Sequence, residues 1–289
     1  MVPMDVVIWE RRPRLRRPIM IAAFEGWNDA ADAATGALDY LARSWQAQPF
    51  AEINPEEFYD FTSARPESRL DEAGTRRIEW PGVRFSAASV PRGGRDVVLM
   101  SGQEPQLKWR TFSAAVSELA RDLGVEMVLS LGALLADVAH TRPVRVTATT
   151  PHPGLGSELG LSRSRYEGPT GILGVLQDAL SRAGIPAASL WANVPHYVAQ
   201  SPSPKATLAL VERATRLLRA NVDVVELQLA SAAYDRQVDE LVAADEDASA
   251  YVARLERDGE PPGDVTDMAP LSAEELAEEA ERYLREQGG

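Results

Sequence analysis

The sequence predicts an α/β protein in which helices cover both faces of a mostly parallel sheet, a three-layer α/β/α sandwich with a C-terminal helical extension. Two patterns lead to this prediction. Short, continuous apolar runs, typical of strands buried on both faces, alternate with amphipathic stretches of roughly 11 to 17 residues. In addition, apolar residues make up 45% of the 289 residues, which is enough to fill a core.

The first strand and helix are predicted on either side of a polar turn. Residues 19–24 are an apolar run rich in small side chains, and Gly26 and Asn28 interrupt it. Asn28 or Asp29 can cap a helix that continues to about Trp45. From Ala34 onward the apolar residues of this helix recur at spacings of 4, 3 and 4, which favours one buried face.

Residues 50–90 are predicted to form strands or hairpins at the edge of the sheet. Proline and glycine recur throughout this region and separate short β-favouring pieces. We expect strands at 57–62 and 83–89.

The remaining elements of the body follow the same alternation. Strands are predicted at 97–101, 125–131, 144–149 and 188–193, and helices at 109–123, 172–183 and 205–219. Gly124 and Gly184 are expected to end the first two of these helices in the left-handed conformation.

The C-terminal segment has a different pattern and suggests three parts, 1–222, 223–258 and 259–289. Six residues step by 3 and 4 as in a helical seam: Val224, Leu227, Ser231, Tyr234, Val238 and Leu241. A second helix, which Asp247 can cap, completes a helical hairpin that must pack on its own body or on a neighbouring subunit. A Pro/Gly-rich linker and a short acidic helix are expected after residue 258.

Composition excludes several classes of protein. Without cysteine there is no disulfide, no thiolate nucleophile and no cysteine-ligated zinc. No histidine lies at metal-ligand spacing from another, so we expect neither a metal site nor a cofactor. From Asp223 onward 19 acidic and five basic residues give a charge of −14, which would repel nucleic acid. No apolar run is long enough to span a membrane and no export signal is found, so we expect a cytoplasmic protein.

Two polar turns follow predicted core strands and are candidates for a binding crevice. Ligands of open α/β sheets bind beyond the carboxyl ends of the strands. The first turn runs from Glu25 to Asp29, where Asn28 and Asp29 are equally well explained as helix caps. In the second, Glu104 could pair with Lys108 or act as an acid or base, or the charges could satisfy the next helix start.

A third candidate is the glycine-rich region 151–174. Gly168-Pro-Thr-Gly171 opens a helix and has the geometry of an anion site, although the same residues are an ordinary helix start. His152 lies between two prolines and is the histidine best placed for a pocket. The candidate pocket residues are Glu25, Gly26, Trp27, Asn28, Asp29, Gly102, Glu104, Lys108, His152 and Gly171. The sequence contains no nucleophile elbow, phosphate loop or His-Glu-x-x-His helix, and its catalytic residues, if any, are unknown.

Three blocks resemble the second proteasome-assembly-chaperone family, in order and spacing, over about residues 18–220. The blocks are Phe24-Glu25-Gly26-Trp27-Asn28-Asp29-Ala30-Ala31, Gly102-x-Glu104-Pro105-x-x-x-Trp109, and Trp191-Ala-x-Val194-Pro195-His196-Tyr197-Val198 followed by Pro202-x-Pro204-x-Ala206. The resemblance implies a phosphorylase/hydrolase-like fold and self-association into small rings, of which a trimer is one form. It also implies proteasome subunits as partners, and its bacterial members include longer chains with an acidic helical C-terminus.

The leading hypothesis is therefore a non-enzymatic, homo-oligomeric scaffold or chaperone that binds neither nucleic acid nor membrane. The chain ends in Gly288-Gly289 and lacks the hydrophobic-Tyr-x tail that such chaperones often insert into proteasome pockets, so docking by that route is not expected. The alternative is a small-ligand-binding protein or a hydrolase- or phosphorylase-like enzyme that uses the crevice at the carboxyl ends of the strands.

Overall fold

The central sheet of the protein has eight strands and is mixed rather than mostly parallel. The computed structural model describes residues 6–71, 74–90 and 94–258. In these ranges the sheet order is β1-β3-β6-β7-β2-β8-β10-β9. The bounds are Val7–Trp9 (β1), Ile19–Glu25 (β2), Gln48–Ile53 (β3), Val83–Ser89 (β6), Asp96–Gln103 (β7), Met127–Ala136 (β8), Val146–Thr149 (β9) and Ala187–Pro195 (β10).

The four central strands, β7, β2, β8 and β10, pair with their neighbours in this group in parallel. The outer strands β1, β3 and β6 on one side, and β9 on the other, are joined by antiparallel pairing. The central strands are those predicted from continuous apolar runs, and six of the seven residues of β2 are buried. The prediction of a mostly parallel sheet thus holds for the centre and is wrong at the edges.

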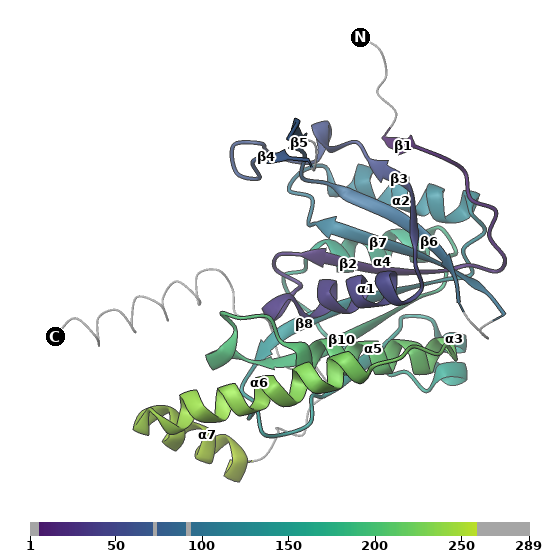
Figure 1. Ribbon diagram of the computed structural model, residues 1–289. Helices are drawn as coiled ribbons and strands as arrows, with labels where there is room; N and C mark the ends of the chain where they lie inside the picture. Colours follow the sequence, from purple (N-terminus) through teal and green to yellow (C-terminus); the bar gives the residue numbers. More distant parts are fainter. Residues whose placement is uncertain (1–5, 72–73, 91–93, 259–289) are drawn as a thin grey trace.

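Helices cover both faces of this sheet, which confirms the three-layer sandwich (Figure 1). Helix α1 (Ala33–Ser44) and α5 (Pro204–Leu218) pack on one face, and α2 (Trp109–Asp122) and α4 (Ile172–Arg182) pack on the other. The helices α3 (Pro153–Leu159), α6 (Val225–Ala243) and α7 (Glu246–Asp258) complete the described chain, together with the short 3-10 turns η1 (Ala30–Asp32), η2 (Pro55–Glu57) and η3 (His196–Val198). Gly124 and Gly184 have φ of +68° and +72° after α2 and α4, as predicted.

The edge region differs most from the prediction. The strand expected at 57–62 is wrong, because a turn follows η2 there and the Asp60 carboxylate accepts hydrogen bonds from the N–H and hydroxyl of Thr62. A separate hairpin, β4 (Glu67–Leu70) paired with β5 (Arg76–Glu79), lies beside the main sheet (Figure 1). The strand expected at 83–89 is confirmed as β6.

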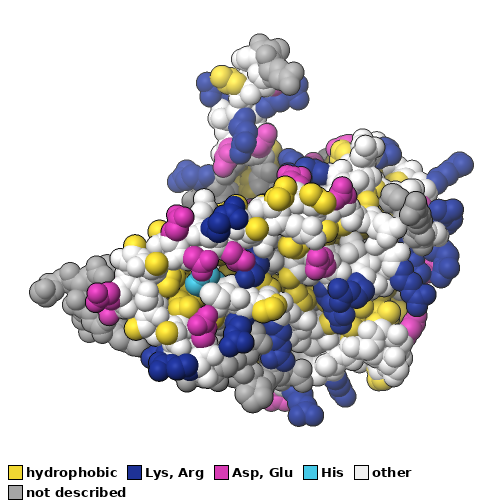
Figure 2. Space-filling model, turned by 60° about the horizontal axis from the view of Figure 1, so that its bottom comes forward, with side chains coloured by type: hydrophobic (Ala, Val, Ile, Leu, Met, Phe, Trp, Pro, Cys, Tyr) yellow, Lys and Arg dark blue, Asp and Glu magenta, His cyan; other side chains and the backbone are white. Residues whose placement is uncertain are grey.

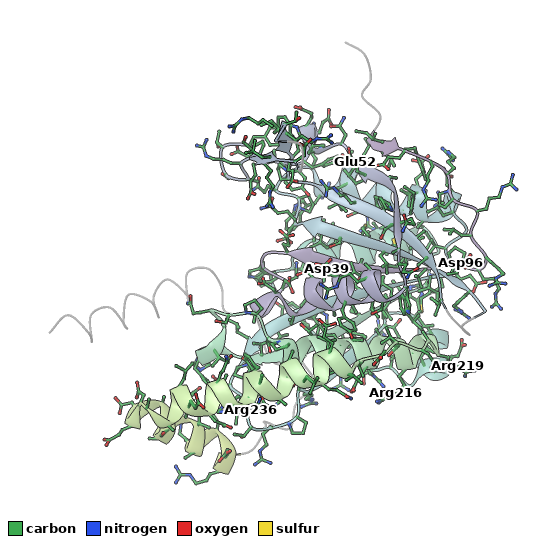
Figure 3. The ribbon with its side chains drawn as sticks, viewed as in Figure 1. Asp39, Glu52, Asp96, Arg216, Arg219 and Arg236 are labelled. Atoms are coloured by element: carbon green, nitrogen blue, oxygen red, sulfur yellow. The ribbon has the colours of Figure 1, made fainter. Side chains whose placement is uncertain are left out.

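The N-terminal segment is held by the first residue of β7. Asp96, labelled in Figure 3, is buried and accepts hydrogen bonds from the backbone N–H of Arg16 at 2.6 Å and from the Ser89 hydroxyl at 2.7 Å. Two donors on separate segments thereby satisfy the buried carboxylate, as a buried charge requires. This contact fixes the entry of the chain into β2.

Helix α6 packs against α5, so the predicted seam is buried on the body of the same chain. Leu227, Ser231, Tyr234 and Val238 are buried, as the seam predicts. Leu241 is 69% exposed, so the seam is wrong at that end, because α6 continues beyond the body (Figure 1). The carboxylate of Asp245, not that of Asp247, accepts the first N–H groups of α7.

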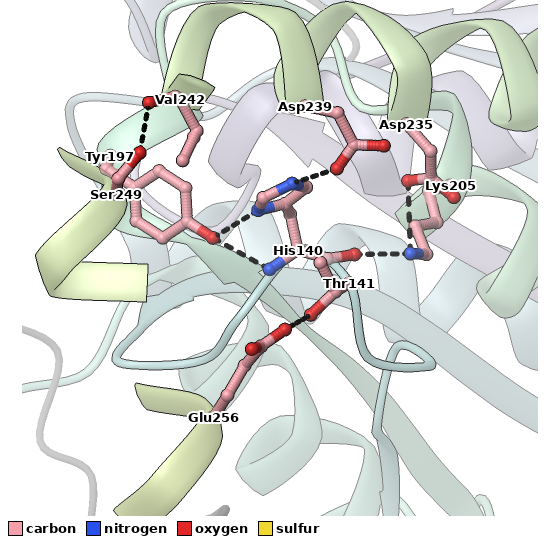
Figure 4. A network of polar contacts seen from close by, with 9 residues as sticks. All are labelled: His140, Thr141, Tyr197, Lys205, Asp235, Asp239, Val242, Ser249 and Glu256. Carbon is pink, nitrogen blue, oxygen red and sulfur yellow. Dashed lines mark hydrogen bonds and ion pairs between the residues drawn. The ribbon is translucent and has the colours of Figure 1, made fainter. Parts of the chain in front are cut away.

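A buried histidine links α6 to the body (Figure 4). The His140 Nε2 lies 3.0 Å from Oδ1 of Asp239 on α6, and its Nδ1 lies 2.8 Å from the Tyr197 hydroxyl. The same hydroxyl accepts the backbone N–H of His140 at 2.7 Å. Each nitrogen of the buried ring thus has a hydrogen-bond partner, Tyr197 at Nδ1 and Asp239 at Nε2.

Further polar contacts around this histidine hold α6 and α7 (Figure 4). Lys205 Nζ donates to the carbonyl of His140 and lies 3.1 Å from Oδ1 of Asp235 on α6. The Thr141 hydroxyl donates to Glu256 on α7 at 2.6 Å. The separation of 223–258 as its own part of the chain stays a prediction, and the linker and acidic helix expected in 259–289 lie outside the described residues.

None of the helices in the described ranges is both long and apolar enough to cross a membrane. The space-filling view in Figure 2 shows apolar side chains scattered between charged side chains of both signs on the face it presents.

Candidate functional site

The two polar turns of the sequence meet at the carboxyl ends of the neighbouring strands β2 and β7. In the parallel register Glu25 lies beside Gln103, and the N–H of Glu104 donates to the carbonyl of Glu25 at 3.1 Å. Gly26 and Gly102 belong to the same corner, with φ of +108° and +152°. The prediction that both turns face one crevice is thus consistent with their positions, whereas a ligand there stays a prediction.

Asp29 caps the first helix of the body. Its Oδ1 accepts the N–H of Ala34 at 2.6 Å and that of Thr35 at 3.2 Å, and the Thr35 hydroxyl donates to its other oxygen. Burial raises the pKa of Asp29, and these hydrogen bonds counteract part of the rise. The hydrogen bonds of this carboxylate hold the start of α1. The role of a helix cap therefore explains the contacts of Asp29.

Glu104 closes the start of a different helix, α4, on the far side of the crevice. Its Oε1 accepts the N–H of Ile172 at 2.8 Å and a hydrogen from Asn28 Nδ2 at 3.1 Å. Burial raises the pKa of Glu104, and the two hydrogen bonds act in the opposite direction. A carboxylate of the chain itself therefore contacts the helix start that the sequence suggested as an anion site, and a bound anion there stays a prediction.

Gly171 allows this arrangement. A Cβ on Gly171 would lie 2.5 Å from Asn28 Nδ2 and 2.9 Å from Glu104 Oε1, closer than real contacts permit. The glycine is needed because two side chains approach its backbone, while its own φ of −86° is open to any residue.

Glu25 and Tyr59 add two further groups with perturbed pKa values near the crevice. The Tyr59 hydroxyl donates to the carbonyl of Gln103 at 2.6 Å. Burial, and then the charges of Glu25 and Glu104, raise the pKa of Tyr59 far above its ordinary value. Partial burial, and then the charges of Asp39 (Figure 3) and Asp32, raise the pKa of Glu25.

Lys108 and His152 do not join this cluster. Lys108 precedes α2 and its Nζ lies 2.9 Å from an oxygen of Glu57, with both side chains about half exposed. Lys108 thus pairs with Glu57 on η2, and not with Glu104 as one of the expected alternatives had it. His152 precedes α3, and its buried Nε2 has no hydrogen-bond partner among the residues that the structure describes.

A cavity of about 150 Å³ lies next to Asn28 and is lined by residues of β8, β9, β10 and α4. Trp27 and Asn28 are the predicted candidates that line it. Sequence reasoning missed the rest of its lining: Leu134, Thr149, Ser164, Tyr166, Pro169, Thr170, Leu173, Gly174, Gln177, Ser189 and Trp191. Trp191 opens the third of the blocks compared above, and six of these residues lie in the glycine-rich region 151–174 that was a candidate as a whole.

Trp191 is positioned by a glycine on the neighbouring strand. The register of β8 and β10 places Gly132 beside Trp191, and a Cβ on Gly132 would lie 2.5 Å from the indole ring. The ring therefore occupies the space beside the bare backbone of Gly132 and forms one wall of the cavity.

The contacts of the crevice residues that the structure describes are those of helix caps and turns. The carboxylates of Asp29 and Glu104 hold helix starts, and in the described ranges no three histidine, aspartate or glutamate side chains gather as metal ligands. His196 lies elsewhere, with Nε2 2.6 Å from the Tyr251 hydroxyl on α7. The alternative of an enzyme at this crevice stays a prediction.

The chain is similar to one protein family over most of its length. The model of the PAC2 family matches residues 23–242. A PAC2 family protein from Streptomyces avermitilis MA is 47% identical, with a TM-score of 0.77 and coverage of 81% of this chain and 99% of that chain. A proteasome-assembly chaperone homologue from Mycobacterium tuberculosis is 46% identical, with a TM-score of 0.74 and coverage of 81% and 99%.

A third similar structure is a Mycobacterium tuberculosis protein described as of unknown function. It is 29% identical, with a TM-score of 0.77 and coverage of 88% of both chains. A comparison with curated proteins finds no match.

Proposed function

The chain belongs to the PAC2 family, and from this we propose that it is a homo-oligomeric chaperone or scaffold in the cytoplasm whose partners are proteasome subunits. The observation that carries the proposal is its 46% identity to a proteasome-assembly chaperone homologue, over 99% of that homologue's length. Identity at this level over nearly a whole chain makes a related role the first hypothesis to test.

The contacts of the shared blocks support a structural role for these residues. Asp29 holds α1, and Glu104 holds both Asn28 and α4. Each of these charged or polar side chains is engaged within the fold, so the blocks build a rigid framework for surfaces elsewhere on the molecule. A scaffold needs such a framework and needs no free acid or base.

The β4–β5 hairpin offers a surface for self-association with a second copy. On one face of the hairpin Leu70 and Ile78 are 64% and 51% exposed, and Trp80, 49% exposed, extends the same row. The opposite face carries an ion pair of Arg69 with Glu79 at 2.8 Å. Isolated two-stranded hairpins are marginally stable in water, so an apolar face of this kind gains stability when it is covered.

Co-expression with proteasome α and β subunits from the same organism tests the proposal. Native mass spectrometry of the purified complexes should show the chain as an oligomer bound to free or partly assembled subunits, and mature particles should form faster than without it. If the chain co-purifies with neither subunit and the rate of particle formation is unchanged, the proposed function is wrong.

A further inference from the structure

We propose that the cavity beside Asn28 is a binding site for one small, uncharged aromatic molecule with hydrogen-bonding groups on its edge. This site is independent of the chaperone-like role, since it uses none of the side chains of the β4–β5 hairpin.

The walls of the cavity select for a flat ring. The indoles of Trp27 and Trp191 and the ring of Tyr166 line it, together with Leu134 and Leu173. Its volume of about 150 Å³ is similar to that of an engineered apolar cavity that holds benzene. Aromatic walls favour stacked or edge-on contacts with a second ring.

Two hydroxyls in the lining of the cavity favour a ligand that can form hydrogen bonds. Ser189 on β10 and Thr149 on β9 are register partners, and both are buried and line the cavity. Within the described ranges neither hydroxyl makes a side-chain hydrogen bond, whereas Asn28 uses only its Nδ2, toward Glu104. A purely apolar ring would leave these groups without partners, at a cost in binding free energy.

The lack of charged side chains in the lining disfavours acids, bases and phosphates as ligands. No lysine, arginine, aspartate, glutamate or histidine is among the residues that line the cavity. The nearest positive end of a helix dipole, at Ile172, is already occupied by the carboxylate of Glu104. An anion entering the cavity would therefore lose its hydration without gaining a partner and would lie near a like charge.

The same hydroxyls also distinguish a polar small molecule from a phenylalanine side chain of a protein partner. A phenylalanine ring carries no group to pair with Ser189 or Thr149, whereas a carboxamide or ring nitrogen on a small molecule does. The two hydroxyls therefore disfavour a phenylalanine side chain as the occupant.

Ligand-observed NMR titrations of the full-length protein with matched probes test the proposal. Benzamide should bind at least about tenfold more tightly than benzoate, which has the same shape and a charge, and than cyclohexanecarboxamide, which lacks the aromatic ring. N-acetylphenylalaninamide represents a protein side chain and should bind more weakly than benzamide.

Two variants test whether benzamide binds in this cavity. Trp27→Ala removes an exposed wall and should weaken benzamide binding about tenfold, whereas Trp80→Ala, a similarly exposed tryptophan outside the cavity, should leave it unchanged. Gln177→Trp fills the cavity from the half-buried surface of α4 and should abolish binding.

Three results would overturn the inference: no benzamide binding by the folded wild-type protein, equal binding of benzoate, or benzamide binding that neither Trp27→Ala nor Gln177→Trp weakens. Tighter binding of N-acetylphenylalaninamide would also overturn it, in favour of a polypeptide partner. The oligomer and its proteasome partners are measured separately, so neither outcome decides the proposed function.

Discussion

The carboxylate of Glu104 accepts the N–H of Ile172 at 2.8 Å, so a loop after β7 closes the start of a helix 68 residues further along the chain. Because the same oxygen accepts from Asn28, Glu104→Ala leaves two donors without their partner. We expect this variant to lower the free energy of unfolding by about 1–3 kcal/mol, measured by urea denaturation. An unchanged midpoint would show that water replaces the carboxylate at little cost.

Glu104→Gln separates the hydrogen bonds from the charge. Burial raises the pKa of Glu104 in the folded chain, so the carboxyl favours folding at pH below its ordinary value and this contribution is lost as pH rises through the raised pKa. Glutamine can keep the hydrogen bonds without a charge. We expect Glu104→Gln to melt at or above the wild-type temperature at pH 8, and this advantage to shrink at pH 4. A larger advantage in acid contradicts the direction of the shift.

Gly171→Ala tests the close approach of Asn28 and Glu104. The added Cβ would lie 2.5 Å from Asn28 Nδ2, and we expect a loss of about 1–3 kcal/mol in the free energy of unfolding. Gly154→Ala is the matched control, because no atom lies within 4 Å of its Cβ position. The two melting curves should separate, with Gly154→Ala close to wild type, and coincident curves would show that the loop before α4 adjusts freely.

Asp239→Ala should loosen the attachment of α6. The variant leaves Nε2 of the buried His140 without its partner. If water does not reach this nitrogen, the free energy of unfolding falls by about 1–3 kcal/mol. Hydrogen exchange of α6 amides should become faster than in wild type, while Glu240→Ala, an exposed neighbour, should not change it. Equal protection in both variants would assign the attachment to apolar packing alone.

The double variant Leu70→Asp, Ile78→Asp tests the proposed self-association. Charges on this exposed face should not unfold the chain but should disfavour its burial against a second copy. Light scattering should report a smaller oligomer than for wild type. Leu241→Asp, at 69% exposure on α6, serves as the control and should keep the wild-type mass. If only the control dissociates, the interface lies on α6.

The elements that could be predicted are those whose structure is determined by their own local sequence. Strands β2, β7, β8 and β10 are buried on both faces and read as apolar runs, and the glycines after α2 and α4 have no competing role. Strand β3 was missed because Gln48–Ile53 mixes proline and glutamate with apolar residues, and its pairing with β6 overrides that composition.

The candidate site was only partly predictable for a related reason. The turn at Glu25 and the loop at Glu104 could be placed together, because parallel strands end on one edge of a sheet. The partner of Glu104 on α4, and the partner of Lys108 at Glu57, depend on loop paths that local patterns do not record. The cavity needed the register of β8 and β10, which the sequence leaves open.

The side-by-side placement of Gly132 and Trp191 constrains how this sheet can evolve. Any side chain at 132 would collide with the indole, whose ring atoms lie 2.5 Å from the position of the missing Cβ. A lineage can therefore acquire a larger residue at 132 only together with, or after, a smaller one at 191, and the reverse change must follow the opposite order. The sizes of the two residues should thus covary among related sequences. Once tryptophan is present at 191, a substitution of Gly132 alone is disfavoured.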